Sequence, residues 1–120
     1  MKIYIAGPMR GIPNFNFPAF FGAEADLIKL GHEVFNPAAR DNLRHGVDIG
    51  AGNHTGSVEQ AAQEHGFNLR DALAHDLKYI CREADGIALL PGWEKSKGAV
   101  AEKSAAEALG LHVIYLEIAA

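Results

Sequence analysis

Three short apolar runs bounded by glycine or proline constrain the fold of this chain more than any other feature. They cover residues 2–6 (KIYIA), 86–90 (GIALL) and 111–116 (LHVIYL), and a weaker run at residues 33–35 ends at Asn36-Pro37. Runs of this kind are typical of parallel strands that are covered on both faces. Because helical patterns separate them, we predict an α/β fold with right-handed crossovers.

Apolar residues recur at helical spacing in three stretches, at residues 17–30, 69–84 and 97–109. Gly31 and Gly110 follow the first and the last of these stretches, as expected where a helix ends. The order of the elements predicts a small three-layer Rossmann-like or flavodoxin-like fold with a four- to five-stranded, mainly parallel sheet. In such sheets, ligands bind beyond the carboxyl ends of the strands.

The segment at residues 38–66 differs in composition from the rest of the chain. It is rich in glycine and poor in large apolar residues, and only residues 57–64 have the pattern of a short helix. We expect a mobile, glycine-rich excursion here and not a second domain. With 120 residues in total, the chain is predicted to be a single domain over residues 1–120 with one hydrophobic core.

Net charge and cysteine content exclude several classes of partner and compartment. The 11 basic and 15 acidic side chains give a net charge of −4, so we expect no cationic field for nucleic acid or an anionic membrane. The first residues lack the apolar core of a signal peptide, and no run approaches the roughly 20 apolar residues of a membrane span. A single cysteine, Cys81, indicates the reducing cytoplasm.

Two carboxylates lie where apolar residues belong. Asp76 is three residues after Leu73 and four before Ile80, so it shares the apolar stripe of its helix. Glu102 shares a helix face with small residues such as Ala106. Both helices flank the second apolar run. The pattern leaves two interpretations open: a structural role at a helix edge, or a pair for acid–base or nucleophilic catalysis.

Two loops at the carboxyl ends of strands are candidates for anion binding. Residues 91–98 (PGWEKSKG) run from a strand into a helix, with Ser96 as the expected N-cap and a lysine on either side of it. A capped turn with solvated lysines is the alternative. Residues 7–11 (GPMRG) offer glycines for close backbone approach and Arg10 for a phosphate or carboxylate. Tyr4 is either a core aromatic or a hydroxyl at the strand end.

Together these residues resemble the nucleoside 2-deoxyribosyltransferase superfamily, and in particular its small phage and bacterial branch. The Asp76 helix and the Ser96–Glu102 element are the specific parts of the resemblance. The matching features cover nearly the whole chain in the same order: residues 5–11 (IAGPMRG), Asn36-Pro37, Asp76-Leu77 before Ala84-Asp85, and residues 90–94 (LPGWE) with Ser96, Gly98 and Glu102.

The resemblance implies a role for each matching position. Glu102 would attack C1′ of the sugar and displace the base, Asp76 would orient the sugar or protonate the base, and Tyr4 would position the nucleophile. Ser96 stands where the transferases commonly have an aspartate, and it is similar to the serine that binds a 5′-phosphate in the family's nucleotide N-hydrolases. The remaining implied substrate-binding residues are Gly7, Pro8, Met9, Arg10, Gly11, Asn36, Trp93 and Gly98.

The leading hypothesis is an N-glycosidase that cleaves the base–sugar bond of a (deoxy)nucleoside 5′-monophosphate through a glutamate nucleophile. Base exchange between deoxynucleosides and a non-catalytic nucleotide-binding module are the alternatives, and a phosphoribohydrolase of the cytokinin-activating type fits Trp93 and Ser96 less well. The six histidines lack metal-ligand spacing, and we expect no metal and no organic cofactor. The expected partner is a small nucleotide or nucleoside, and the resemblance implies a homodimer or higher homo-oligomer.

Overall fold

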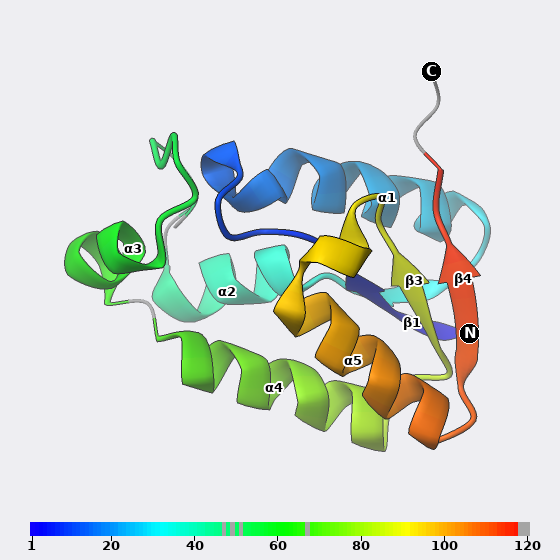
Figure 1. Ribbon diagram of the computed structural model, residues 1–120. Coiled ribbons are helices and arrows are strands. Elements are labelled where there is room, and N and C mark those ends of the chain that lie inside the picture. The colour runs from blue at the N-terminus through cyan, green and yellow to red at the C-terminus, as the bar shows by residue number, and fades with distance from the viewer. Residues whose placement is uncertain (47, 49, 51, 67, 118–120) are drawn as a thin grey trace.

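A four-stranded parallel sheet forms the centre of the chain, which the computed structural model describes at residues 1–46, 48, 50, 52–66 and 68–117 (Figure 1). In these residues the strand order is β2-β1-β3-β4, as in flavodoxin-like sheets. The predicted α/β fold is confirmed, although the last two strands are shorter than the apolar runs. The strands are β1 (Lys2–Ala6), β2 (Glu33–Phe35), β3 (Gly86–Leu89) and β4 (His112–Tyr115).

Helices cover both faces of the sheet and make three layers. α1 (Phe17–Lys29) packs on one face, whereas α5 (Lys97–Ala108) packs on the other with α4 (Leu69–Arg82) beside it (Figure 1). The chain order explains this division. The connection from β1 to β2 runs one way across the sheet and the later connections run the other way, so right-handed crossovers place their helices on opposite faces.

Side chains of β1 belong to two separate core clusters, because successive residues of a strand point to opposite faces. Ile3 and Ile5 belong to the cluster that contains the buried face of α1. Tyr4 and Ala6 belong to the cluster that contains buried residues of α4 and α5. This alternation places the Tyr4 side chain on the face of the sheet that α4 and α5 cover.

Helix starts follow capping residues of the sequence. Each of four helices is preceded by a side chain that accepts a hydrogen bond from an amide of its first turn. α4 and α5 begin where we predicted and end one or two residues earlier. The four capping residues are Asn36, Ser57, Asn68 and Ser96.

Among the described helices, none is both long enough and apolar enough to cross a membrane.

The buried face of α1 is narrower than the apolar pattern of residues 17–30 predicts, since that pattern includes Phe20, Phe21, Leu27 and Ile28. Phe20 and Leu27 are buried as expected, but Phe21 is 40% exposed and Ile28 is 55% exposed. Adjacent residues of a helix point about 100° apart, so only one member of each apolar pair can face the sheet. The helix ends at Lys29, before Gly31, whose positive φ of 91° fits the predicted stop.

The segment at residues 38–66 contains more regular structure than we predicted. α2 (Pro37–His45) occupies its start, and α3 (Val58–His65) confirms the short helix expected at residues 57–64. Ala38 and Ala61 join the core cluster on the α1 side of the sheet. Positions 47, 49 and 51 lie outside the described residues, and the mobility that we expect of the segment stays a prediction.

Backbone hydrogen bonds join the middle of this segment to the loop after β1. The amide of Gly11 donates to the carbonyl of Gly56 at 3.0 Å, and the amide of Asn14 donates to the carbonyl of Asn53 at 2.7 Å. A Cβ at Gly56 would lie 2.4 Å from the carbonyl oxygen of Ile12, and its φ is +66°. Glycine is therefore required where the segment approaches the loop.

Candidate functional site

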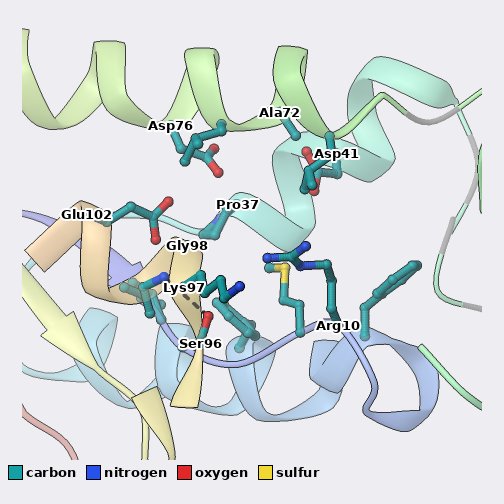
Figure 2. A pocket seen from close by; sticks show the side chains of 18 of the residues that line it. Arg10, Pro37, Asp41, Ala72, Asp76, Ser96, Lys97, Gly98 and Glu102 are labelled. Carbon is teal, nitrogen blue, oxygen red and sulfur yellow. Dashed lines mark hydrogen bonds between the residues drawn. The ribbon is translucent and has the colours of Figure 1, made fainter. Parts of the chain in front are cut away.

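A pocket of ≈ 210 Å³ lies at the carboxyl end of β1, beside the start of α5. Ala6 of β1 is paired with Leu89 of β3, so the two strands end at the same level. The chain after β1 leads to β2 on one side, and the chain after β3 leads to β4 on the other side. Open α/β sheets bind ligands at such a point, where the strand order reverses. We call this the inner pocket (Figure 2).

Glu102 and Asp76 extend into the inner pocket from two neighbouring helices, α5 and α4 (Figure 2). Each carboxylate lies on the buried face of its helix, between two apolar residues. Glu102 is 6% exposed and Asp76 is 8% exposed. Because the two helices pack against each other, these charges at apolar positions share one buried space.

Tyr4 links the central strand to the Glu102 carboxylate. Its hydroxyl donates a buried hydrogen bond of 2.6 Å to Oε2 of Glu102. Its ring stacks on Phe35 at a centroid distance of 5.5 Å, which fixes the direction of the hydroxyl. Tyr4 is therefore both a core aromatic and a hydroxyl at the strand end. The hydrogen bond holds one carboxylate oxygen and leaves Oε1 for a ligand.

Burial and neighbouring charge favour the protonated form of Glu102 at neutral pH. Burial raises the pKa of the Glu102 carboxyl from its ordinary 4.5 to about 8, and the charge of Asp76 adds to this effect. The hydrogen bond from Tyr4 lowers the pKa of Glu102, whereas the charge of Asp41 raises it further. Burial, with the charges of Glu102 and Asp76, also raises the pKa of the Tyr4 hydroxyl well above 10. Tyr4 is therefore a permanent donor, and the two carboxyls titrate as a coupled pair.

Asp41 is a third carboxylate at the inner pocket, and we did not predict it from the sequence. It lies on α2 and is 3% exposed, and Figure 2 shows it beside the part of α4 that carries Ala72. The available signal was Asn36-Pro37, a helix start that puts Ala38 and Asp41 on one face. Among the described residues, no three or more His, Cys, Asp or Glu side chains are grouped to hold a metal ion.

An apolar wall lines much of the inner pocket, and we did not predict it either. Phe15 reaches it from a turn in which Asn14, Phe15 and Asn16 have left-handed φ angles of 56°, 55° and 59°. Such a backbone costs roughly 1–2 kcal/mol per residue, and strain of this kind is found at binding sites. The phenylalanine rings of this wall suit the flat face of a nucleobase. The wall consists of Ile5, Phe15, Phe17, Phe20, Val58, Leu69 and Leu73.

Ser96 caps α5 as predicted, and cationic side chains surround it. Its Oγ accepts a hydrogen bond of 3.2 Å from the amide of Ala99. Lys97 and Gly98 are the first two residues of the helix, so their amides have no intrahelical partner. Ser96, Lys97, Gly98 and Arg10 all line the inner pocket, and Figure 2 shows them across the pocket from the Asp76 carboxylate. The inner pocket thus has carboxylates on one side and, on the other side, groups that can bind an anion.

The loop after β1 is divided between the inner pocket and a second hollow next to it. Gly7, Met9 and Arg10 line the inner pocket, whereas Pro8 and Gly11 line the second hollow. A Cβ at Gly7 would lie 2.7 Å from the Cβ of Leu90. Glycine is therefore needed here for the loop to pass close to the end of β3.

The structure does not bring Asn36 and Trp93 to either hollow. Asn36 caps α2, where its side chain accepts a hydrogen bond of 2.9 Å from the amide of Ala38. The Trp93 ring lies 6.0 Å from the ring of Tyr115 in β4, and the Lys103 ammonium lies 5.1 Å from its centroid. Both residues therefore have structural contacts away from the carboxylates.

Comparison with known proteins gives one match that covers almost the whole chain. A family model described as "Domain of unknown function (DUF4406)" matches residues 1–115. The matched region includes all the strands and helices described above, and every residue of the inner pocket. No curated protein and no solved structure matches the chain.

Proposed function

The chain belongs to the DUF4406 family, and we propose that it is an N-glycosidase that cleaves the base–sugar bond of a (deoxy)nucleoside 5′-monophosphate. The buried cluster of Tyr4, Glu102 and Asp76 in a pocket with an aromatic wall and a cationic side carries this proposal. Each part suits one part of the substrate. The carboxylates suit the reacting sugar carbon, the aromatic wall suits the base, and the start of α5 suits the phosphate.

Glu102 is the proposed nucleophile. Its Oε1 attacks C1′, the bond from C1′ to the base nitrogen breaks, and the electron pair leaves with the base, which takes up a proton. Water then cleaves the glycosyl ester, so that the sugar gains a hydroxyl and Glu102 is regenerated. Carboxylate pairs of retaining glycosidases act in the same way, through a transition state with positive charge on the sugar. Tyr4 keeps the nucleophile in place throughout.

The coupled carboxyls supply both the base and the acid of this reaction. With a Glu102 pKa of about 8, the pair holds one proton at neutral pH. In the reactive form this proton lies on Asp76, which leaves Glu102 ionised for attack and gives Asp76 a proton for the leaving base. This arrangement is the minor one of the pair in the free protein, because burial favours the proton on Glu102.

The start of α5 holds the 5′-phosphate in this proposal. The Ser96 hydroxyl accepts from Ala99 and still has a proton to donate to a phosphate oxygen. The amides of Lys97 and Gly98 and the Arg10 guanidinium add donors on the same side. Glu102 follows Ser96 by six residues, roughly 9 Å along the helix. That separation allows the phosphate and C1′ of one nucleotide to reach both ends.

The test of this function is release of free base from a panel of ribo- and deoxyribonucleoside monophosphates, followed by chromatography. We expect at least one nucleotide to give base and sugar phosphate in equal amounts. Addition of a second base distinguishes transfer, because a transferase would then form a new nucleotide. Nucleotide binding with no turnover of any member of the panel would contradict the proposal and favour a non-catalytic module.

Ser96→Ala is expected to weaken binding of the substrate monophosphate by about tenfold, because a hydrogen bond to a charged group is lost. The measurement is titration of the nucleotide into each protein. Ser57→Ala is the matched control, since Ser57 caps α3 in the same way with a 3.1 Å hydrogen bond from Gln60. Each variant should lose about 1 kcal/mol of stability with its cap. Equal affinity in the two variants would remove Ser96 from the phosphate site.

Asp76→Asn is expected to lower kcat/KM by about 10²-fold and to change the shape of its pH profile. In the natural chain, kcat/KM should be level near neutrality and fall above about pH 8, where the pair loses its last proton. The variant has no acid to lose, so the falling limb should disappear. Its kcat/KM should rise with pH through a pKa below 8, because the charge that helps raise the Glu102 pKa is gone.

Rates measured from pH 5 to 10 check this profile. Asp71→Asn is the control, because Asp71 is an exposed aspartate in the first turn of the same helix. It should keep both the rate and the falling limb. Unchanged pH dependence in Asp76→Asn would show that Asp76 does not hold the catalytic proton.

We also propose that the protein works as a homo-oligomer in the cytoplasm. Tyr115 is 59% exposed and lies in the edge strand β4, and a second copy of the chain would cover this edge. Cys81 is a free, exposed thiol, which favours a reducing compartment. Sedimentation at the mass of one chain would contradict the oligomer.

A further inference from the structure

A second hollow adjoins the inner pocket on the side of the proposed phosphate site. It has a volume of ≈ 800 Å³, and we call it the outer basin. Met9, Arg10, Ser96 and Lys97 line both the inner pocket and the outer basin. The two spaces therefore meet at the group of residues that would hold the 5′-phosphate. A monophosphate with its sugar at Glu102 would end at this boundary and leave the outer basin empty.

The outer basin is cationic although the chain as a whole is acidic. Arg10, Lys95 and Lys97 line it, and no aspartate or glutamate does so among the described residues. None of these three cations forms an ion pair within the part of the chain that the structure describes. The net charge of the chain is −4, so an unpaired group of three cations is a local feature. Such a group attracts an anion with more than one charge.

The turn after β3 leaves room in the outer basin for a ligand that extends past the boundary with the inner pocket. Gly92 adopts a left-handed φ of +87° in the turn after β3, and it has no side chain to block the space. Lys95 follows three residues later, and its amide donates to the carbonyl of Gly92 at 3.1 Å. Lys95 lines the outer basin and not the inner pocket, and it is one residue farther from Glu102 along the chain than Ser96 is.

We propose that the substrate carries a 5′-pyrophosphate, with its first phosphate at Ser96 and its second in the outer basin beside Lys95 and Arg10. This inference rests on the proposed base-cleaving function and narrows its substrate class. The reaction itself is unchanged. The bond from C1′ to the base breaks, water provides the hydroxyl for the sugar and the proton for the base, and the pyrophosphate is not altered. The second phosphate is either free or esterified, since apolar side chains of the outer basin can cover an attached group.

The experiment compares the affinities of matched nucleotides for the Glu102→Gln protein, which cannot consume them. Adenosine 5′-monophosphate, adenosine 5′-diphosphate and di(adenosine) pyrophosphate are titrated in turn, together with their guanosine, cytidine and uridine counterparts. We expect the diphosphate of the preferred nucleoside to bind about tenfold more tightly than its monophosphate. The advantage should shrink as salt is raised, because the cations are exposed. Tighter binding of the dinucleotide than of the diphosphate would indicate that the second phosphate is esterified. Tighter binding of the diphosphate would indicate that it is free.

Lys95→Gln separates the outer basin from the inner pocket. It is expected to reduce the ratio of diphosphate to monophosphate affinity at least about threefold. Lys29→Gln is the control, because Lys29 is an exposed cation at the far end of α1. It should leave the ratio unchanged. Equal affinity for monophosphate and diphosphate, or an equal loss of affinity for both in Lys95→Gln, would overturn the inference.

Base release by the natural chain tells this inference apart from the function on which it rests. Release of base from monophosphates with no preference for diphosphates would contradict only the pyrophosphate inference. Preferential binding of diphosphates with no base release from any nucleotide would contradict the proposed function and leave the outer basin as a pyrophosphate site. Failure of every nucleotide to bind would overturn both.

Discussion

Replacing Glu102 by glutamine is expected to lower kcat for base release at least ~10³-fold, because the nucleophile is removed. The amide has nearly the size and shape of the carboxyl, and its oxygen can still accept the hydrogen bond from Tyr4. The pocket should therefore keep its form while losing the atom that attacks C1′. Chromatographic measurement of free base at pH 7 and saturating nucleotide gives the rate, and titration should show affinity within a few-fold of the natural chain.

Glu107→Gln is the matched control for this loss. Glu107 lies on the same helix, is exposed and pairs with Lys103 at 3.0 Å, so its charge is remote from the pocket. It should keep the full rate. A full rate in Glu102→Gln would exclude Glu102 as the nucleophile. Loss of activity in both variants would indicate damage to α5, which circular dichroism would detect.

The strands and the long helices could be predicted because each leaves a signal within a few residues. β1 and β3 are short apolar runs next to glycine, and α5 begins at a serine cap. α2 leaves a weaker signal. Its buried face includes Ala38 and Asp41, one small residue and one charged one, so there is no apolar periodicity to detect. Only its start, an Asn cap followed by Pro37, marked it.

The same difference separates the parts of the site that were predictable from those that were not. Asp76 and Glu102 stand out because a charge at an apolar helix position is visible in the sequence itself. Phe15 does not stand out in the sequence, because its place in the wall depends on a left-handed turn and no glycine in that turn indicates it. Trp93 shows the converse. It lies in a loop at the correct end of the sheet, yet its ring packs toward Tyr115 and not into the pocket. Side-chain direction in a loop is set by tertiary contacts.

The free energy of unfolding is expected to decrease as pH rises from 5 to 8 because of Glu102. Burial, and then the charge of Asp76, raises the folded-state pKa of this carboxyl to about 8, against an ordinary value of 4.5. Between these values the folded protein holds a proton that the unfolded chain has released, so stability falls with pH. The contribution is complete below about 4.5 and lost above about 8. At about 1.4 kcal/mol for each pH unit, the whole contribution amounts to roughly 5 kcal/mol, of which roughly 4 kcal/mol is lost above pH 5.

Glu102→Gln isolates this contribution together with its coupling to Asp76, because the other titrating groups are shared with the natural chain and cancel in the difference. Urea unfolding at intervals from pH 5 to pH 9 should show the variant gaining roughly 4 kcal/mol relative to the natural chain, most of it between pH 5 and 8. Glu107→Gln should stay within about 0.5 kcal/mol at every pH, because its ion pair is exposed. A constant difference between Glu102→Gln and the natural chain would mean that the folded pocket holds no extra proton. The shared proton that the proposed reaction needs would then be absent, so this stability curve tests the chemistry without any substrate.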